Sequence, residues 1–264
     1  MIRVPFVQPK RPSVAVIRLQ GMISNGGRGL DDVSLAPAIE RAFAKGKPDA
    51  VALQINSPGG SPVQSSLIAA RIRRLAAEKE IPVFAFVEDV AASGGYWLAC
   101  AADEIFLDAT SITGSIGVIS AGFGLDELIG RYGVERRVHT SGKSKSFLDP
   151  FRPEKDEDVT RLKGWLEQIH AAFIDHVKDR RGAKLADDPA LFTGEIWVGV
   201  TAVEKGLADG IGHLVPVMKE RFGDKVRFRR YGPKKSLLSR FGARVIGDAI
   251  AGVEERAAFA RFGL

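Results

Sequence analysis

Short, continuously apolar runs alternate with amphipathic stretches through the first part of the chain, and this alternation constrains the fold more than any other feature. The runs are Val14–Leu19, Ala50–Ile55 and Pro82–Val87. Strands that are buried on both faces have this character. The stretches between them, around 35–44 and 62–78, place apolar residues three or four apart, as helices do. The pattern predicts an α/β fold with a mainly parallel sheet and right-handed crossovers, flanked by helices.

The same alternation continues beyond the third run. We expect a helix over 94–102, a strand over 104–107, a helix near 125–131 and a strand over 135–138. A long charged helix follows from 154 to about 181, with an apolar stripe along one side. Residues 14–215 are therefore predicted to form one domain.

The bulk composition is that of a globular protein and offers no membrane span. The chain has 264 residues, of which 45% are hydrophobic and 27% charged. No stretch approaches the roughly 18 apolar residues that a spanning helix needs. Pro5, Pro9 and Pro12 interrupt the N-terminal segment, which therefore does not resemble a signal peptide. These features favour a cytoplasmic protein.

The positive charge is concentrated near the C-terminus. The formal net charge is +6, and residues 216–264 form a predicted basic extension whose apolar positions between Lys234 and Val253 trace one face of a helix. Two interpretations stay open: a helix that packs on its own or a neighbouring subunit, and one that lies on anionic lipid as a peripheral membrane contact. Because the rest of the chain is nearly balanced, we expect no nucleic-acid partner. The basic residues are Arg227, Arg229, Arg230, Lys234, Lys235, Arg240 and Arg244.

Metal and disulfide chemistry are not expected. Cys100 is the only cysteine, which excludes a disulfide framework and a thiolate-rich metal site. The histidines are scattered without metal-ligand spacing, and each is interpreted as a surface or packing residue. We predict no metal and no cofactor. The histidines are His139, His170, His176 and His213.

Three clusters of serine and glycine each follow a predicted strand. They span 56–60 (Asn-Ser-Pro-Gly-Gly), 92–96 (Ala-Ser-Gly-Gly-Tyr) and 113–117 (Thr-Gly-Ser-Ile-Gly). Ligands bind beyond the carboxyl ends of parallel strands, so the clusters should converge on one cleft. Glycine there lets a substrate backbone come close.

Ser93 is the strongest candidate for a nucleophile among these serines. It lies between a strand and a helix, where free amides and the helix dipole favour developing negative charge. Gly59 and Gly60 precede another helix, and their amides are candidate donors to an oxyanion, an interaction worth about 3–4 kcal/mol per donor. The alternative is that each cluster only caps a helix.

A serine nucleophile needs a base, and lysine is the best candidate type. Lys143 and Lys145 lie in a Ser-Gly-Lys-Ser-Lys-Ser segment after the predicted strand at 135–138. A lysine acts as a base when burial lowers its pKa from about 10.4 to about 7–8. A hydroxyl such as that of Ser115 would orient the amine. Alternation does not separate the two lysines, which would point the same way on a strand.

Taken in order, these motifs resemble the signal peptide peptidase A (SppA) family of serine peptidases. The resemblance covers about 14–214 and continues through Phe-Thr-Gly at 192–194 and Ala-Val-Glu-Lys-Gly-Leu-Ala-Asp at 202–209. It implies the ClpP/crotonase superfold and a Ser-Lys catalytic dyad. Matched by position, Ser93 is the nucleophile, Lys145 the base and Ser115 the residue that hydrogen-bonds the lysine, with Gly59 and Gly94 as oxyanion donors.

The resemblance also implies a substrate class and an assembly. We expect an endopeptidase that cleaves extended, mainly apolar peptides such as signal peptide remnants, and a homo-oligomer with its active sites facing an interior. Two alternatives are weighed against it. A crotonase-like acyl-CoA enzyme would need catalytic carboxylates after the Gly-Gly turns, and none is present; a non-catalytic ring scaffold would not need Ser93 and Lys145.

Overall fold

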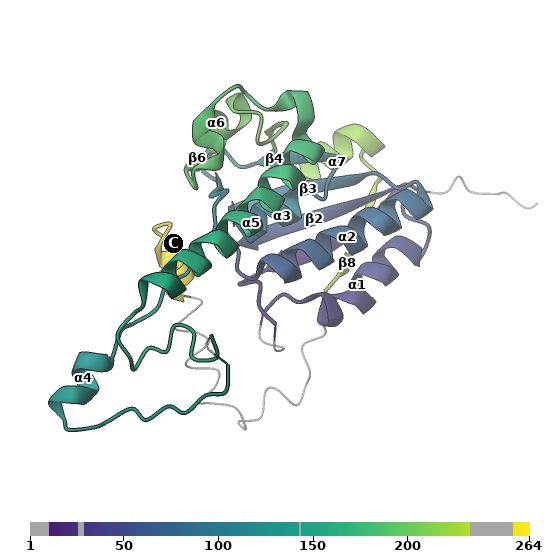
Figure 1. Ribbon diagram of the computed structural model, residues 1–264. Coiled ribbons are helices and arrows are strands. Elements are labelled where there is room, and N and C mark those ends of the chain that lie inside the picture. Colours follow the sequence, from purple (N-terminus) through teal and green to yellow (C-terminus); the bar gives the residue numbers. More distant parts are fainter. Residues whose placement is uncertain (1–10, 26–28, 143, 233–255) are drawn as a thin grey trace, which may run out of the picture.

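A computed structural model gives the structure of the chain (Figure 1). It describes residues 11–25, 29–142, 144–232 and 256–264. The predicted tail helix between Lys234 and Val253 lies outside these residues, so its two interpretations stay predictions.

The core of the molecule is a parallel sheet. Strands β1 (Ser13–Gln20), β2 (Ala50–Ser57) and β3 (Val83–Ala92) pair in register, with Ile17 opposite Leu53 and Leu53 opposite Ala85. These three side chains are fully buried. The predicted strands and the predicted α/β class are confirmed.

Strand β3 pairs with two different strands along one of its edges. Its first half pairs with β4 (Glu104–Leu107) and its second half with β5 (Ile112–Gly114), while an irregularity in its pairing with β2 lies between Ile55 and Ser57. On this edge, the partner of β3 therefore changes from β4 to β5 shortly before β3 ends. The sheet of the described residues is completed by β6 (Ile196–Val198), antiparallel to β5, by β7 (Gly210–Ile211) on β4, and by β8 (Arg227–Tyr231), parallel to β1.

Helices cover both faces of this sheet (Figure 1). On one face lie α1 (Asp32–Ala44), α2 (Pro62–Lys79) and α3 (Gly94–Ala99), which bury the larger apolar cluster. The predicted helix over 62–78 is confirmed, and it begins where the Ser61 side chain accepts from the Gln64 amide. The opposite face is covered by α7 (Leu214–Phe222), with Met218 fully buried against Phe84 and Phe86.

Part of the basic C-terminal segment belongs to this sheet. Strand β8 is an edge strand on β1, with Phe228 packed against the α7 side and Arg227, Arg229 and Arg230 exposed. Charged residues on an edge strand discourage pairing with other chains. A structural role on the sheet edge therefore accounts for these three arginines.

Helix α5 (Asp156–Arg181) crosses the molecule beside α3, and an arm made of the described residues 118–142 and 144–155 projects from its N-terminal end (Figure 1). The arm carries the short helix α4 (Asp126–Arg131). The strand predicted over 135–138 is wrong: residues 135–137 are exposed, Val138 is partly buried, and none of them pairs with a strand in the described chain, because the arm leaves the sheet. After α5 come the 3-10 turns Gly182–Lys184 and Pro189–Phe192, and α6 (Gly199–Glu204).

A buried ion pair fastens the C-terminal end of α5 to the sheet. The Arg181 guanidinium is 3% exposed and lies 2.7 Å from the Asp209 carboxylate, which also accepts from the Ile105 amide at the start of β4. Burial by itself would raise the pKa of Asp209, but hydrogen bonds from Arg181 and Lys184 outweigh it and lower the pKa. The pair therefore holds α5 in one position relative to β4 and β7.

Breaking this pair should destabilise the fold strongly. Asp209→Asn leaves the buried Arg181 charge uncompensated, and we expect the free energy of unfolding to fall by about 3–5 kcal/mol in urea titration. The matched control is Glu78→Gln, which breaks a half-exposed pair with Arg74 and should change stability little. Equal losses in the two variants would contradict the anchoring role of Asp209.

Candidate active site

Ser93 occupies a sharp turn between β3 and α3. Its backbone has φ 51° and ψ −122°, a conformation that favours glycine, and holding a serine there costs about 1–3 kcal/mol. The Ser93 amide donates to the Gly114 carbonyl at 2.9 Å, and the Ser93 side chain makes no capping hydrogen bond to α3. Ser93 is partly exposed between buried neighbours. The structure therefore does not support the capping interpretation for this serine.

The glycines around Ser93 allow backbone segments to touch. A Cβ on Gly59 would lie 2.9 Å from the Ser93 Cβ and 2.8 Å from the Gly94 nitrogen. A Cβ on Gly94 would lie 2.4 Å from the Ser65 hydroxyl, and one on Gly95 would lie 2.4 Å from the Ser57 carbonyl oxygen. Larger side chains would push the turn after β2 away from the turn after β3. The two Gly-Gly motifs thus serve one tight backbone contact.

Two backbone amides at this contact are free to bind an anion. Within the described chain, the Gly60 and Gly94 N–H groups donate to no acceptor. The two residues lie close together, because a Cβ built on Gly94 would lie 3.3 Å from the Gly60 nitrogen. The Gly59 N–H instead donates to the Ser57 hydroxyl at 3.2 Å. Among the three glycines predicted for the oxyanion, Gly60 and Gly94 offer the free donors, and Gly59 supplies the close approach.

Ser115 shares the cleft with Ser93 and is also strained. Its φ is 50°, and its amide donates to the Glu195 carbonyl at 2.7 Å. Both serines line one pocket of about 670 Å³. The predicted convergence of the clusters on one cleft is therefore seen for Ser93 and Ser115, together with Gly60 from the first cluster.

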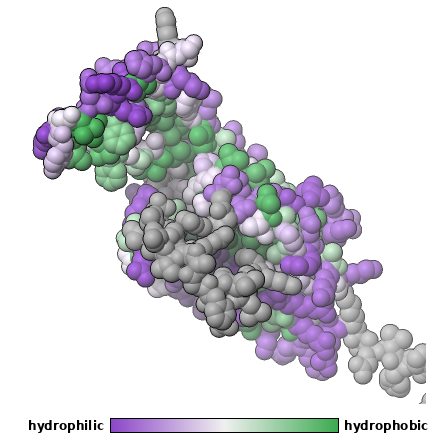
Figure 2. All heavy atoms as spheres, turned by 90° about the horizontal axis from the view of Figure 1, so that it is seen from below, coloured by the Kyte–Doolittle hydropathy of each residue, from purple (hydrophilic) through white to green (hydrophobic). Residues whose placement is uncertain are grey.

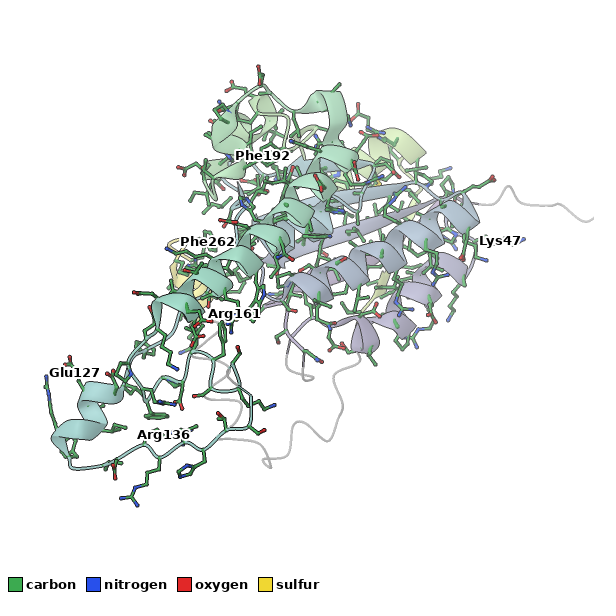
Figure 3. All side chains as sticks on the ribbon, in the orientation of Figure 1. Lys47, Glu127, Arg136, Arg161, Phe192 and Phe262 are labelled. Atoms are coloured by element: carbon green, nitrogen blue, oxygen red, sulfur yellow. The ribbon has the colours of Figure 1, made fainter. Side chains whose placement is uncertain are left out.

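The remaining walls of the pocket are largely apolar. Trp97 stacks on Phe173 of α5 with ring centres 4.9 Å apart, and its other ring contact is His176 at 4.7 Å. Phe262 of the C-terminal segment 256–264 also lines the pocket and lies beside α5 (Figure 3). The other apolar lining residues are Pro58, Pro62, Val118, Ile119 and Ile169.

Lys145 does not line this pocket in the single described chain. It lies on the arm, its side chain is exposed, and its amide donates to the Gly142 carbonyl. Glu127 and Arg136 mark the outer part of the same arm in Figure 3. Lys143 lies outside the described residues. The structure therefore brings together Ser93, Ser115 and the glycines predicted to bind the oxyanion, and leaves Lys145 apart from them.

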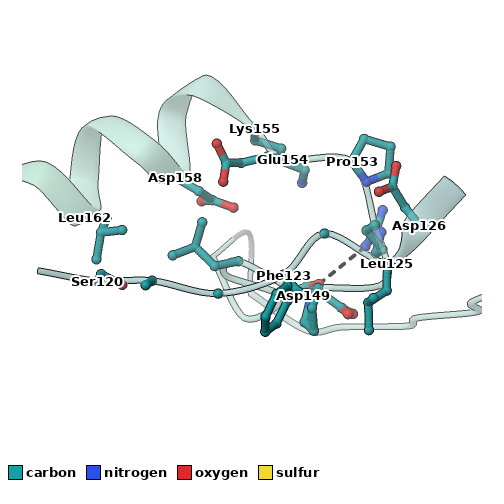
Figure 4. A pocket seen from close by; sticks show the side chains of 17 residues that line it. Ser120, Phe123, Leu125, Asp126, Asp149, Pro153, Glu154, Lys155, Asp158 and Leu162 are labelled. Atoms are coloured by element: carbon teal, nitrogen blue, oxygen red, sulfur yellow. Dashed lines mark hydrogen bonds between the residues drawn. The ribbon is translucent and has the colours of Figure 1, made fainter. Parts of the chain in front are cut away.

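A second pocket, of about 650 Å³, lies at the base of the arm (Figure 4). It is bounded by residues 120–126, by Ser146 with residues 148–150 and 152–155, and by Asp158 and Leu162 on the first turns of α5. Asp149 accepts from the Phe151 amide, which is the main reason that its pKa is lowered, with Arg136 adding to the shift.

His170 is a pocket residue that the sequence did not single out. It lies on α5, lines the pocket beside Ser93 and contacts the Ile116 carbonyl oxygen through Nε2 at 3.0 Å. In the sequence, a histidine on a charged amphipathic helix looks like any packing histidine. Its place in the pocket becomes visible only because α5 crosses the cleft. Cys100 is no rival nucleophile, because it is buried and burial raises its pKa to about 12.

Comparison with known proteins assigns this arrangement to a family. The family model described as "Peptidase family S49" matches residues 76–222, which include Ser93, Ser115 and Lys145. The chain belongs to peptidase family S49. The predicted resemblance to SppA peptidases is confirmed by relatives that carry the SppA name.

The relatives of this chain differ in length and in name. "Serine protease SPPA, chloroplastic" of Arabidopsis thaliana is 31% identical over 90% of this chain and 36% of its own. "Putative protease slr0021" of Synechocystis is 31% identical over 79% of this chain and 73% of its own. "Na(+)/H(+) antiporter NhaA" of Brucella melitensis is 50% identical over 95% of this chain. This chain spans only 37% of that relative, and the antiporter name is that of the longer protein.

The solved structures agree on the S49 fold. The "1510-N membrane-bound stomatin-specific protease", solved as a serine-to-alanine mutant, has a TM-score of 0.53 and 14% identity over 86% of this chain and 100% of its own. The ClpP/crotonase-like fold class is thus confirmed. No described helix is both long enough and apolar enough to span a membrane.

The strained backbone at Ser93 predicts that this serine lowers the stability of the fold while it serves activity. Ser93→Gly should raise the free energy of unfolding by about 1 kcal/mol or more, because glycine adopts this conformation without strain. The matched control is Ser66→Gly within α2, which should lower it by about 0.5 kcal/mol. Thermal and urea unfolding measure both. A destabilised Ser93→Gly variant would show that the turn is not strained.

Proposed function

We propose that this chain is a serine endopeptidase with Ser93 as nucleophile and Lys145 as general base. One observation carries the proposal. Ser93 has a strained backbone, its side chain does not cap α3, and it shares one pocket with Gly60 and Gly94, whose amides are free. Membership of peptidase family S49 supports hydrolysis of peptide bonds over the acyl-CoA chemistry of a crotonase.

The chemistry follows from these groups. The Ser93 oxygen attacks the scissile carbonyl carbon while its proton passes to the neutral Lys145 amine. The resulting oxyanion accepts from the Gly60 and Gly94 amides. The lysine then protonates the leaving amine, which departs as the acyl-enzyme forms. A water molecule gives a proton to the lysine and attacks the ester carbonyl. The lysine then returns that proton to the Ser93 oxygen as its bond to the acyl carbon breaks, which releases the acid product and regenerates both groups. Ser115 orients the amine throughout.

We propose further that a neighbouring subunit supplies the lysine. A lysine base must be desolvated, whereas Lys145 is exposed in the single chain. The arm that carries it projects from the body and exposes large apolar side chains, including Phe123 at 84% and Tyr132 at 79%. Figure 2 shows apolar side chains gathered on this arm, at the upper left. Covering the arm by a second copy would bury both these side chains and the amine.

The pocket walls support a preference for apolar peptides. Trp97, Phe173 and Ile169 present rings and aliphatic groups to the space next to Ser93. Side chains of matching character gain about 25 cal/mol for each Å² of apolar surface that they bury there. The proposed substrates are therefore extended peptides with apolar residues near the cleaved bond, such as signal peptide remnants. The solved relative in complex with a substrate peptide, a lysine-to-alanine mutant, is called stomatin-specific.

Ser93→Ala should abolish hydrolysis of a fluorogenic apolar peptide and leave the oligomer intact, because it removes only the nucleophile. We expect the turnover rate to fall by about four orders of magnitude or more. Peptide mass mapping after treatment with a fluorophosphonate should place the label on Ser93. Full activity of the Ser93→Ala protein would refute the proposed function.

The two lysines make a matched pair for identifying the base. Lys145→Ala should lose hydrolysis, whereas Lys143→Ala should keep it. In the unmodified protein the rate should rise through about pH 7–9 as a lysine base loses its proton. Loss of activity in Lys143→Ala alone would transfer the role to that residue, and a flat profile would contradict a lysine base. Mixing the inactive Ser93→Ala and Lys145→Ala subunits should restore activity if the two groups come from different subunits.

A further inference from the structure

The turn that carries Ser115 is held from several sides. Ser115 has φ 50°, and its amide donates a hydrogen bond to the Glu195 carbonyl. The Gly117 amide in turn donates to the Ser115 carbonyl at 2.9 Å. The Ile116 side chain between them is fully buried. A strained backbone persists only when its surroundings over-determine it. Each contact to this turn therefore helps to decide where the Ser115 hydroxyl lies.

His170 supplies the contact from the opposite side. Its Nε2 lies 3.0 Å from the Ile116 carbonyl oxygen, across 54 residues of sequence. A carbonyl oxygen only accepts hydrogen bonds, so Nε2 carries the proton and donates it. The helix that carries His170 is anchored at its far end by the Arg181–Asp209 pair. This hydrogen bond therefore ties the turn to a helix that is itself fixed to the sheet.

We propose that His170 is a positioning residue, which holds the Ser115 turn and thereby keeps the Ser115 hydroxyl in the pocket where the base must be oriented. This inference deepens the proposed function and rests on it. The imidazole acts through the peptide group that follows Ile116, and takes no proton from Ser93. An N–H donor of similar reach should replace it.

His176 provides an internal control on the same helix. Its Nε2 also contacts a backbone carbonyl, that of Trp97, at 3.2 Å, and its ring stacks on the Trp97 ring. Burial is the main reason that the pKa of His176 is lowered. His176 does not line the pocket around Ser93. Substitutions at the two histidines therefore remove the same kind of bond from different places.

The test compares four variants of the assembled protein: His170→Leu, His170→Gln, His176→Leu and His176→Gln. His170→Leu should lower kcat by about 10- to 100-fold, the effect expected when a catalytic group is misplaced by about 1 Å, with KM within about threefold. His170→Gln should recover most of kcat, because its amide donates at a similar reach. Both His176 variants should keep kcat and lower the melting temperature.

Hydrogen exchange supplies a readout that does not depend on activity. Amides of the segment 112–118 should exchange faster in His170→Leu than in the unmodified chain, and at the normal rate in His170→Gln and in the His176 variants. Unchanged exchange at this segment, or unchanged kcat in folded His170→Leu, would overturn the inference. A His170→Gln protein as inactive as His170→Leu would also overturn it, because the imidazole itself would then take part in proton transfer.

Failure of the inference is distinguishable from failure of the proposed function. If Ser93→Ala is inactive and His170→Leu turns over normally, only the positioning role is lost. If Ser93→Ala remains active, the serine mechanism itself is wrong, and the exchange data still decide whether His170 holds the turn.

Discussion

The contact between two glycine-rich turns is the constraint on which the rest of the site depends. The turn after β2 and the turn after β3 approach so closely that a Cβ on Gly59 or Gly94 would collide with backbone or with a serine side chain. This approach leaves the Gly60 and Gly94 amides free beside the Ser93 hydroxyl. The β3 turn is also forced into a glycine-like conformation at Ser93. The same contact thus creates the proposed oxyanion site and exposes the proposed nucleophile to the pocket.

Helix α5 connects this local geometry to the whole molecule. Its C-terminal end is fixed by the buried Arg181–Asp209 pair, and its middle contacts α3 through His176 and the Ser115 turn through His170. Its first turns form the base of the arm. One helix therefore fixes both sides of the cleft and determines where the arm leaves the body.

The arm explains why a single chain is an incomplete enzyme under the proposed mechanism. A lysine in water keeps its proton, because the charged form is well solvated, and a charged amine is no base. Lys145 and several large apolar side chains of the arm are exposed together. An assembly that covered them would lower the free energy through apolar burial and would desolvate the amine at the same time. Self-association and catalysis would then depend on the same surface.

Local patterns in the sequence were sufficient for the layers of the fold and for the position of Ser93 between a strand and a helix. Buried strands such as Ala50–Ser57 are apolar on both faces, and the helix from Pro62 begins at a capping serine, so neighbouring residues alone identify them. The sequence places Ser93 at the junction of a strand and a helix, and only the structure shows that its side chain does not cap that helix. The lysine segment was not predictable, because the strand predicted at 135–138 depends on a partner strand that the arm does not reach.

What only the tertiary structure decided are the contacts between residues far apart in the chain. The choice of Gly60 over Gly59 as a free donor depends on the Ser57 hydroxyl, and the role of His170 depends on α5 crossing a turn 54 residues away. The sequence by itself determined the strands and helices of the central sheet and the position of Ser93 at a strand-to-helix turn, but not the course of the arm. It did not determine which amides remain unpaired, because an amide's partner is set by packing and not by its neighbours in sequence.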